Sequence, residues 1–317
     1  MIRPLLQLTR WQNLFFLAIL MYVMQYWVAA AVMHSYGFPN QLPWWLVLML
    51  ISAVLLIAAG GYVINDYFDV KIDRINRPER LVVTQAVSKE QAMRLFQVLT
   101  ALGVAIGVAA AIVLRDWTIG TIFVLIPGLL WFYSSSYKRQ LLVGNLIVSF
   151  AAAVVPILIA LANVTILRQR YSLVMEYLPL PHDIFVWLGG FALFAFLTTF
   201  VREVIKDLQD QMGDRELECH SLPIVIGEMW TKVIVTTLLI IIIALICFVH
   251  WHYMPYDVAW NSLSTRYVCF GVLVPFICEI ILLWNARIPS DYRNAQLLMK
   301  FCMFMGVMYS FVIHNML

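Results

Sequence analysis

The chain has 317 residues, of which 63% are hydrophobic and only 12% are charged. This number of charged side chains is too small to cover the solvent-exposed surface of a soluble protein of this size. The composition therefore predicts a membrane protein that crosses the bilayer several times. The formal net charge of +3 is too small for a nucleic-acid-binding surface, and we expect no nucleic-acid partner.

Nine apolar stretches are long enough to cross a bilayer, since a hydrocarbon core about 30 Å thick needs about 20 helical residues. They cover residues 12–33, 43–64, 95–114, 117–134, 142–162, 183–204, 231–250, 266–285 and 297–316. We therefore predict an all-α membrane protein, a bundle of nine transmembrane helices that forms a single domain over residues 1–317. Only residues 115–116 separate the third span from the fourth, which predicts a tight helical hairpin.

The charged residues between the spans predict the orientation of the chain. When successive connections are assigned to alternate sides, 17 of the 21 Lys and Arg residues share the side of the N-terminus. The remaining four are Arg115, Arg168, Arg170 and Arg266. Because Lys and Arg accumulate in cytoplasmic loops, we predict a cytoplasmic N-terminus and an external C-terminus.

Two acidic segments at the cytoplasmic ends of spans resemble each other. The segment NDYFDVKID, residues 65–73, carries Asp66, Asp69 and Asp73. The segment KDLQDQMGD, residues 206–214, carries Asp207, Asp210 and Asp214, each 141 residues after its counterpart. The shared spacing places three carboxylates on one helical face. We predict two pseudo-repeated halves, each with one stripe of carboxylates, and these stripes are able to face each other across a cavity.

Like charges at this spacing repel one another unless a cation lies between them. Mg²⁺ is the first choice, because it binds one or two carboxylates, keeps several waters and bridges to substrate phosphates. The predicted metal ligands are Asn65, Asp66, Asp69, Asp73, Asp207, Asp210 and Asp214.

Basic and hydroxyl side chains on the same predicted face of the membrane suit a diphosphate. Lys138 follows the hydroxyl-rich end of the fourth span, where tyrosine hydroxyls can orient a phosphate beside it. Arg202 and Lys206 lie one turn apart, just before the second stripe. The predicted phosphate-binding residues are Arg74, Arg77, Tyr133, Tyr137, Lys138, Arg202 and Lys206.

These motifs resemble those of the UbiA superfamily of intramembrane prenyltransferases. The family pattern N-D-x-x-D-x-x-x-D matches Asn65, Asp66, Asp69 and Asp73, and its second motif D-x-x-x-D matches Asp210 and Asp214. The family's Tyr-Ser and Lys positions after the fourth span match Tyr133, Ser134 and Lys138. The nine-helix architecture of the family agrees with the predicted spans, so the resemblance covers essentially the whole chain.

The resemblance implies a transferase that moves a prenyl group from an allylic diphosphate donor to a lipophilic acceptor. Two Mg²⁺ ions would bind the diphosphate, and Lys138 would help to neutralise it as the carbon–oxygen bond ionises. The resulting allylic cation would be shielded inside the apolar bundle. The residues expected to carry catalysis are Asp66, Asp69, Lys138, Asp210 and Asp214.

The setting of the second motif, REVIKDLQDQMGD, resembles that of the geranylgeranylglyceryl phosphate geranylgeranyltransferases, which act in archaeal-type ether-lipid synthesis. Gln209 and Gln211 stand where acidic residues are common in that group. The implied acceptor is the free hydroxyl of geranylgeranylglyceryl phosphate, and the donor is a geranylgeranyl diphosphate. The family's first helix lines the acceptor pocket, which assigns Arg10 and Asn13 to that pocket. The alternative acceptor is an aromatic ring, as in quinone biosynthesis.

A cation-coupled transporter is the other class of protein with repeated halves and carboxylates in its spans. Transporter sites usually lie near the middle of the bilayer, whereas these aspartates lie at the ends of spans, which favours phosphate chemistry. We expect an enzyme in the cell membrane with its active site toward the cytoplasm and no obligate protein partner.

Overall fold

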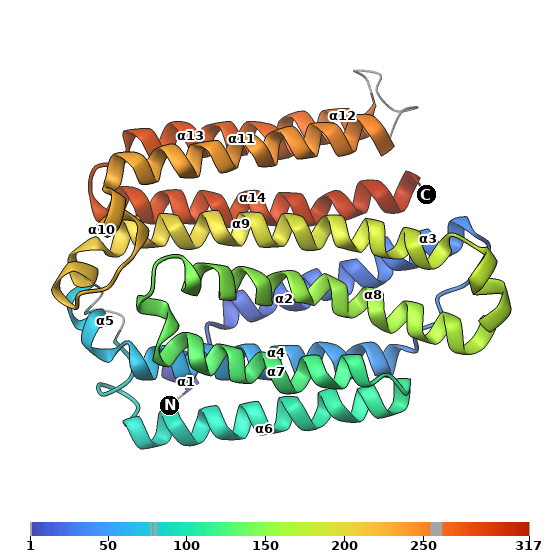
Figure 1. Ribbon diagram of the computed structural model, residues 1–317, viewed down its shortest axis with the longest axis horizontal. Helices are drawn as coiled ribbons and strands as arrows, with labels where there is room; N and C mark the ends of the chain where they lie inside the picture. The colour runs from blue at the N-terminus through green and yellow to red at the C-terminus, as the bar shows by residue number, and fades with distance from the viewer. Residues whose placement is uncertain (1, 77, 79–80, 254–261, 317) are drawn as a thin grey trace. The chain divides into compact units, whose positions relative to one another are not determined.

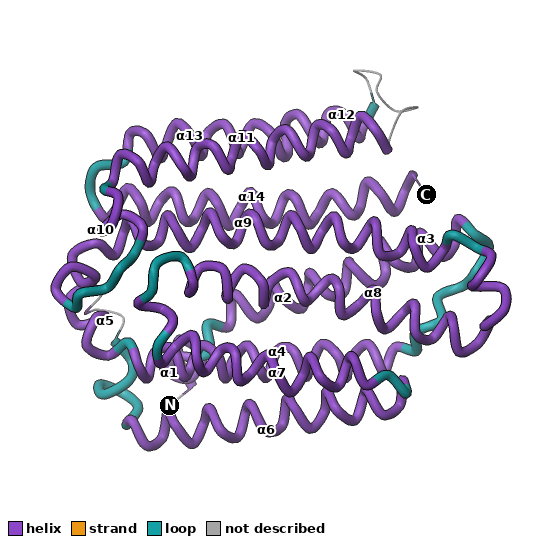
Figure 2. The backbone as a smooth tube through the Cα atoms, viewed as in Figure 1, coloured by secondary structure: helices purple, strands orange, loops and turns teal. Residues whose placement is uncertain are grey.

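A computed structural model describes residues 2–76, 78, 81–253 and 262–316 of the chain, and these residues are almost entirely helical (Figures 1 and 2). Within them there is no β-strand, only an isolated bridge between Val83 and Val87. Nine helical segments of the described chain are long and apolar enough to cross a membrane. They cover Trp11–Ser35, Trp44–Phe68, Lys89–Leu114, Trp117–Ser135, Val143–Tyr177, Leu180–Glu216, Glu228–His252, Leu263–Asn285 and Pro289–Asn315. The predicted all-α fold with nine spans is confirmed.

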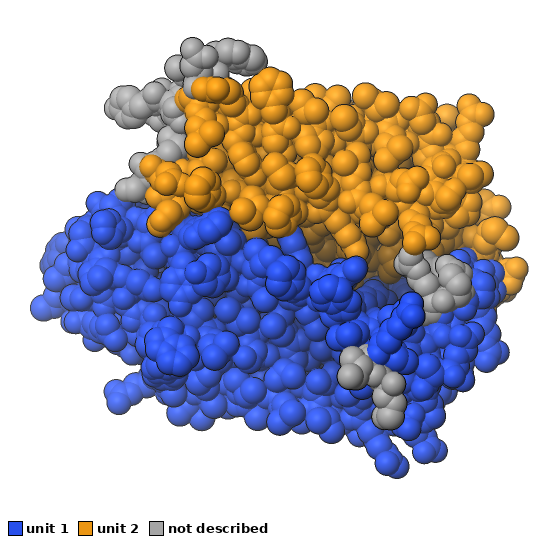
Figure 3. All heavy atoms as spheres, turned by 180° about the vertical axis from the view of Figure 1, so that it is seen from behind, with its two compact units in different colours: residues 1–138, 154–192, 317 blue, residues 139–153, 193–316 orange. Residues whose placement is uncertain are grey.

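The chain divides into two compact units (Figure 3). The first unit consists of Met1–Lys138 and Val154–Ala192, with the C-terminal residue 317. Its first helices are α1 (Ile2–Leu8), α2 (Trp11–Val23), the π-helix η1 (Met24–Ala29) and α3 (Ala30–Ser35). They are followed by α4 (Trp44–Phe68), α5 (Val70–Asn76), α6 (Lys89–Leu114), α7 (Trp117–Ser135) and the 3₁₀-helix η3 (Tyr137–Arg139).

The second unit consists of Arg139–Ala153 and Leu193–Met316. The long helices α8 (Val143–Tyr177) and α9 (Leu180–Glu216) each run through both units. The remaining helices of the second unit are α10 (Leu222–Ile226), α11 (Glu228–Tyr253), α12 (Leu263–Arg266), the π-helix η5 (Tyr267–Leu273), α13 (Val274–Asn285) and α14 (Pro289–Met316).

In the first unit α4 packs closely against α6, because glycine stands at the contact on both helices. A methyl group added at Gly103 of α6 would lie 2.8 Å from Cγ1 of Ile57, and one added at Gly60 of α4 would lie 2.6 Å from the Thr100 hydroxyl. Both distances are shorter than a van der Waals contact, so neither position has room for a larger side chain. This contact fixes α4, the helix that carries the first acidic segment.

The predicted hairpin between the third and fourth spans is present as the connection between α6 and α7. Arg115 ends α6 in the left-handed conformation, with φ 50°. The Asp116 carboxylate then caps α7 by accepting a hydrogen bond of 2.9 Å from the backbone N–H of Thr118. A carboxylate at this position satisfies a backbone donor that the first turn of a helix leaves without an intrahelical partner.

The fifth and sixth spans are longer than the sequence predicted. Residues 163–182 were expected to connect them, but α8 continues to Tyr177 and α9 begins at Leu180. The polar side chains of this extension have partners inside the first unit: Asn163 donates to Gln25 at 2.7 Å, and Arg170 donates to Gln41 at 2.7 Å. A helix whose polar groups are satisfied in this way can continue past its apolar stretch. The backbone kinks at Tyr171, with φ −129° and ψ 24°.

The second unit is built on a buried apolar core that α9, α11, α13 and α14 share. Val204 and Leu208 of α9, Leu239 of α11, Phe276 of α13 and Met299 of α14 belong to it, and all are at most 2% exposed. The apolar face of α9 packs into this core, and the aspartates of the second acidic segment lie on the opposite face of the helix. The core therefore fixes the direction in which these aspartates point.

Candidate active site

The first acidic segment lies where α4 ends and α5 begins. Asn65 and Asp66 belong to the last turn of α4, Asp69 is its C-terminal cap, and Asp73 lies on α5. Asp69 has φ −82° and ψ 0°, which interrupts the regular helix at the middle carboxylate. The turn is nevertheless kept, because the backbone N–H of Asp73 donates to the Asp69 carbonyl at 2.9 Å. The stripe expected on one helix is therefore divided between two.

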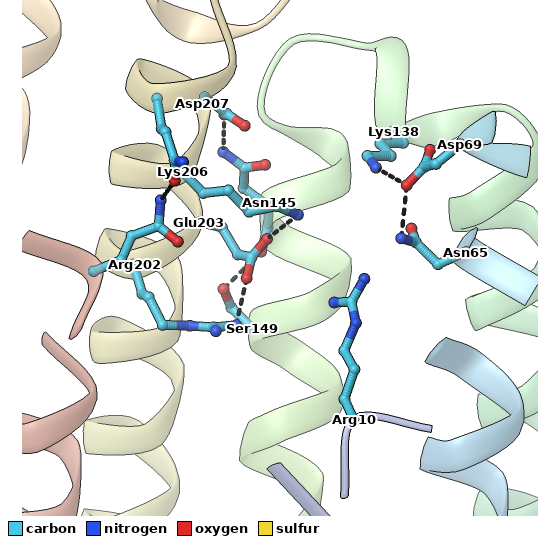
Figure 4. A network of polar contacts seen from close by, with 12 residues as sticks. Arg10, Asn65, Asp69, Lys138, Asn145, Ser149, Arg202, Glu203, Lys206 and Asp207 are labelled. Carbon is cyan, nitrogen blue, oxygen red and sulfur yellow. Dashed lines mark hydrogen bonds and ion pairs between the residues drawn. The ribbon is translucent and has the colours of Figure 1, made fainter. Parts of the chain in front are cut away.

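Asp69 is the centre of a buried cluster within the first unit (Figure 4). One of its carboxylate oxygens, Oδ2, accepts from the Lys138 ammonium and from the Asn65 amide, whose Nδ2 lies 2.7 Å away. Burial by itself lowers the pKa of Lys138, but the charge of Asp69 and the nearby Tyr133 outweigh burial and raise that pKa above its usual value. Lys138 therefore carries its positive charge at neutral pH.

Asn65 has a feature that fits a metal ligand. The residue is 6% exposed, and its amide oxygen Oδ1 is buried without a hydrogen-bond partner in the described structure. Leaving a buried oxygen without a partner costs about 1–3 kcal/mol, so such an atom in a native protein calls for an explanation. A neutral amide oxygen beside a carboxylate is a suitable ligand for Mg²⁺. The residues around Asp69 therefore fit the metal that the sequence predicts.

Asp66 is paired with a residue that sequence analysis assigned to the acceptor pocket. Nη2 of Arg10 lies 2.8 Å from Oδ1 of Asp66, and the guanidinium group stacks on the Tyr62 ring at 5.0 Å. Arg10 has a left-handed backbone with φ 50°, which is uncommon for a residue with a side chain. Asn13 is half-buried in the first turn of α2, and its backbone N–H donates to the Arg10 carbonyl at 2.8 Å. The acceptor role of both residues remains a prediction.

The second acidic segment lies wholly on α9, in the second unit. Asp207, Asp210 and Asp214 share one helix, as their spacing predicted. Asp207 accepts a hydrogen bond of 2.8 Å from the side-chain amide of Asn145, at the start of α8. Asp207 and Asp210 are half-buried and Asp214 is buried. Asp207 thus contacts a neutral amide, whereas Asp66 and Asp69 of the first segment contact cations.

Glu203 is a fourth carboxylate on the same face of α9, and sequence analysis did not include it. It lies one turn before Asp207 and is 6% exposed. Arg202 contacts its Oε1, and Nζ of Lys206 lies 3.4 Å from its Oε2 (Figure 4). The i, i+4 spacing of Glu203 and Asp207 was a signal in the sequence. Asn145 gave no such signal, because it lies 62 residues before Asp207.

The other predicted site residues occupy more varied positions. Tyr133 is buried at the end of α7, and Tyr137 is exposed beside Phe132, at 6.3 Å between ring centroids. Asp73 is half-buried, and Arg74 is exposed on α5. The predicted phosphate ligand Arg77 lies outside the described residues. Roles in phosphate binding for Arg74 and the two tyrosines remain predictions.

The described residues contain no group of three or more His, Cys, Asp or Glu side chains placed to hold a metal by themselves. Such a group suits metals that the protein encloses completely, whereas Mg²⁺ usually takes one or two carboxylates and completes its shell with water and substrate phosphates. The roles of the two acidic segments as Mg²⁺ ligands remain predictions.

Comparison with known proteins identifies the class of membrane enzyme to which this acidic site belongs. The sequence pattern of the UbiA prenyltransferase family matches residues 22–308, so the chain belongs to this family. The predicted family and the predicted class of enzyme, a prenyltransferase in the membrane, are confirmed.

Three known proteins are similar to this chain. The digeranylgeranylglyceryl phosphate synthase of Ignicoccus hospitalis is 36% identical over 176 residues, which are 56% of this chain and 52% of that protein. A solved structure described as digeranylgeranylglyceryl phosphate synthase in membranes has a TM-score of 0.65 at 20% identity, covering 100% of this chain and 99% of that one. A UbiA homologue from Archaeoglobus fulgidus, bound to GPP and Mg²⁺, has a TM-score of 0.55 at 13% identity, with 98% and 99% coverage. The two structures show a shared fold.

Proposed function

We propose that this chain transfers a geranylgeranyl group from geranylgeranyl diphosphate to the free hydroxyl of geranylgeranylglyceryl phosphate, in a Mg²⁺-dependent reaction of ether-lipid synthesis. The observation that carries the proposal is the cluster around Asp69, where a buried carboxylate, a charged lysine and an amide oxygen without a partner meet. The named relative from Ignicoccus hospitalis supports the choice of acceptor.

The first chemical step breaks the bond between carbon 1 of the prenyl chain and the diphosphate oxygen. The electron pair of that bond leaves with the diphosphate, and an allylic cation remains. Lys138 stabilises this step because its charge lies where negative charge grows on the leaving group. Its contact with Asp69 holds the ammonium in place before the donor arrives, so little reorganisation is needed.

The two acidic segments hold the metal in this proposal, with one ion for each segment. Asn65, Asp66, Asp69 and Asp73 supply oxygen ligands from the first unit. Asp207, Asp210 and Asp214 supply them from the second unit. The metal contributes neutralisation of the diphosphate charge, as Mg²⁺ does for transferring or leaving phosphate groups in other enzymes. The Archaeoglobus fulgidus homologue with bound GPP and Mg²⁺ supports the use of Mg²⁺ with a prenyl diphosphate.

The second chemical step joins the acceptor oxygen to carbon 1 of the prenyl cation and releases the hydroxyl proton. That proton goes to a carboxylate of the acidic segments or to the released diphosphate. The apolar spans keep bulk water from the cation, which would otherwise be hydrolysed to an alcohol. The nine spans also suit two lipid substrates with long hydrocarbon chains.

The location of the reaction follows from the distribution of charge. In the topology predicted from the sequence, Lys138 and both acidic segments lie on the side that carries most Lys and Arg residues. We propose that this side is cytoplasmic, with the N-terminus there and the C-terminus outside. The single domain with two pseudo-repeated halves is proposed on the same basis, since each compact unit carries one acidic segment.

The proposal is tested with membranes that contain the protein and a labelled geranylgeranyl diphosphate. We expect Mg²⁺-dependent release of diphosphate and, with geranylgeranylglyceryl phosphate, a product with two ether-linked chains identified by its mass. Both signals should be lost in Asp69→Ala and Asp210→Ala, and both should persist in the exposed control Glu90→Gln. A hydroxybenzoate or a naphthoate in place of the lipid acceptor tests the aromatic alternative. If both alanine variants keep full activity, the assignment of the two segments is wrong.

A further inference from the structure

The group formed by Arg202, Glu203 and Lys206 is called here the α9 triad. All three residues lie on consecutive turns of α9 in the second unit, just before the acidic segment of that helix. Arg202 and Lys206 contact different oxygens of the Glu203 carboxylate (Figure 4). One buried anion therefore holds two cations, one turn apart, in fixed positions.

The α9 triad carries an excess positive charge and a donor without a partner. Two cations and one carboxylate leave one net positive charge in a setting where all three side chains are mostly buried. Nε of Arg202 is buried and has no hydrogen-bond partner in the described structure. A guanidinium group binds best through two parallel N–H donors to an anion such as a phosphate. The unsatisfied donor of Arg202 therefore points to an anionic ligand.

Glu203 itself is poorly placed to take a proton from a substrate. Each of its oxygens already contacts a cation, so both are directed toward side chains of the protein. Its geometry suits a residue that positions the two cations for another group.

The α9 triad precedes the carboxylates assigned to the diphosphate on the same helix. Arg202 lies eight residues before Asp210 and Lys206 lies four, which correspond to about 12 Å and about 6 Å along a helix axis. An anion on Arg202 and Lys206 is therefore close to a diphosphate held at Asp210 and Asp214, but it lies on an earlier turn of α9. The proposed acceptor carries its own phosphate, only a few bonds from the hydroxyl that reacts.

We propose that the α9 triad is the subsite for the phosphate monoester of the lipid acceptor, and that Glu203 is the positioning residue that holds Arg202 and Lys206 for it. This inference rests on the proposed function and deepens it, because it assigns the acceptor phosphate to named residues. The phosphate accepts from the unpartnered Nε of Arg202 and from the Lys206 ammonium, while Glu203 keeps the two cations at the spacing that a single phosphate bridges.

The experiment compares geranylgeranylglyceryl phosphate with geranylgeranylglycerol, which lacks the phosphate, in wild type and in Arg202→Gln and Lys206→Gln. Loss of a charge-assisted contact should lower kcat/KM for the phosphorylated acceptor by about tenfold or more, mainly through KM. It should lower kcat/KM for the dephosphorylated acceptor much less, so the preference for phosphate falls toward one. Arg293→Gln, an exposed arginine of the same unit, is the matched control and should keep the wild-type preference.

Glu203→Gln should reduce the same preference, and Glu203→Asp, which keeps the charge, should restore part of it. Mg²⁺-dependent diphosphate release without acceptor reports whether each variant is folded and binds the donor. If Arg202→Gln and Lys206→Gln lower kcat/KM equally for both acceptors, the triad is structural and the inference is wrong, although the proposed function stands. If wild type uses only an aromatic acceptor, the proposed acceptor and this inference both fail. If diphosphate is never released, the proposed function itself fails.

Discussion

The two acidic segments have the same spacing of aspartates but different contacts. In the first unit, Asp66 and Asp69 are paired with Arg10 and Lys138, which come from other parts of the chain. In the second unit, Asp207 accepts from the neutral Asn145, while Arg202 and Lys206 of the same helix contact Glu203. The same motif therefore occurs in two different settings, one in which two carboxylates contact cations of other segments and one in which the first carboxylate contacts a neutral amide.

The difference suggests a division of work between the two segments. A carboxylate that already pairs with a buried lysine can bind a metal only if the pair rearranges, whereas one held by a neutral amide does not have to give up a cation first. We therefore expect the second segment to contribute more to Mg²⁺ affinity and the first to contribute more to charge neutralisation on the diphosphate.

Replacing Lys138 should have the largest effect on the first segment. Lys138→Met leaves Asp69 buried without its cation, so we expect almost complete loss of prenyl transfer and a free energy of unfolding lowered by up to about 3 kcal/mol. Thermal unfolding in detergent measures the second effect. The double variant Lys138→Met/Asp69→Asn removes both charges and should recover most of the stability while remaining inactive. If the double variant is as unstable as Lys138→Met, the pair is not the cause.

In the second segment, Asn145→Ala should affect Asp207 alone. Loss of a hydrogen bond to a charged carboxylate should lower the free energy of unfolding by about 1.5–3 kcal/mol. Because Asp207 then loses its orientation, the Mg²⁺ concentration for half-maximal activity should rise about tenfold or more. Titration of diphosphate release with Mg²⁺ measures this change. Asn315→Ala, which removes an exposed amide on α14, is the matched control, and an equal shift there would contradict the expectation.

Asn65→Ala tests the amide oxygen that lacks a partner. Loss of Oδ1 should change the free energy of unfolding little, because this atom makes no hydrogen bond in the described structure. The substitution also removes the hydrogen bond from Nδ2 to Asp69. Asn65→Leu fills a similar volume and has no oxygen. We expect both variants to need about tenfold more Mg²⁺, a smaller effect than the loss of Lys138. An unchanged Mg²⁺ titration with reduced stability would show that Asn65 is only structural.

Arg10→Gln should have the smallest effect of the series. Its side chain is 36% exposed, and partly exposed ion pairs contribute about 0.2–1 kcal/mol. We expect a small loss of stability and a modest loss of activity, measured as KM for donor and for acceptor. A rise confined to the acceptor KM would support the acceptor pocket predicted from the sequence. A rise confined to the donor KM would assign Arg10 to the metal and diphosphate side through Asp66.

Much of this arrangement was predictable because it depends on local chemistry. Apolar stretches define the spans, and the repeated Asp spacing defines the acidic face of α9, since both depend on helical periodicity alone. The Lys138 contact with Asp69 was not predictable as a pair, because the two residues are 69 positions apart and meet only after α4 and α7 have packed. The same holds for Asn145 and Asp207.

The extent of α8 could not be predicted for a related reason. Polar residues after position 162 are typical of a connection, yet Asn163 and Arg170 remain in a helix because Gln25 and Gln41 provide partners for them. Glu203 is different, because its spacing from Asp207 was available in the sequence and a charge near the end of a span is usually a topology signal. Its contacts with two cations distinguish it only in three dimensions.

The glycine contact between α4 and α6 limits how the first segment responds to a ligand. With Gly103 seated against Ile57 and Ala53, and Gly60 seated against Thr100, neither helix has room to slide along the other. The part of α4 that carries Asn65 is therefore held rigidly. If a metal replaces Lys138 at Asp69, the movement must come from side-chain rotation and from the break in helix geometry after Phe68. The interruption at Asp69 is therefore the hinge of the first unit. A larger residue in place of Gly103 would displace this hinge without changing any charged residue.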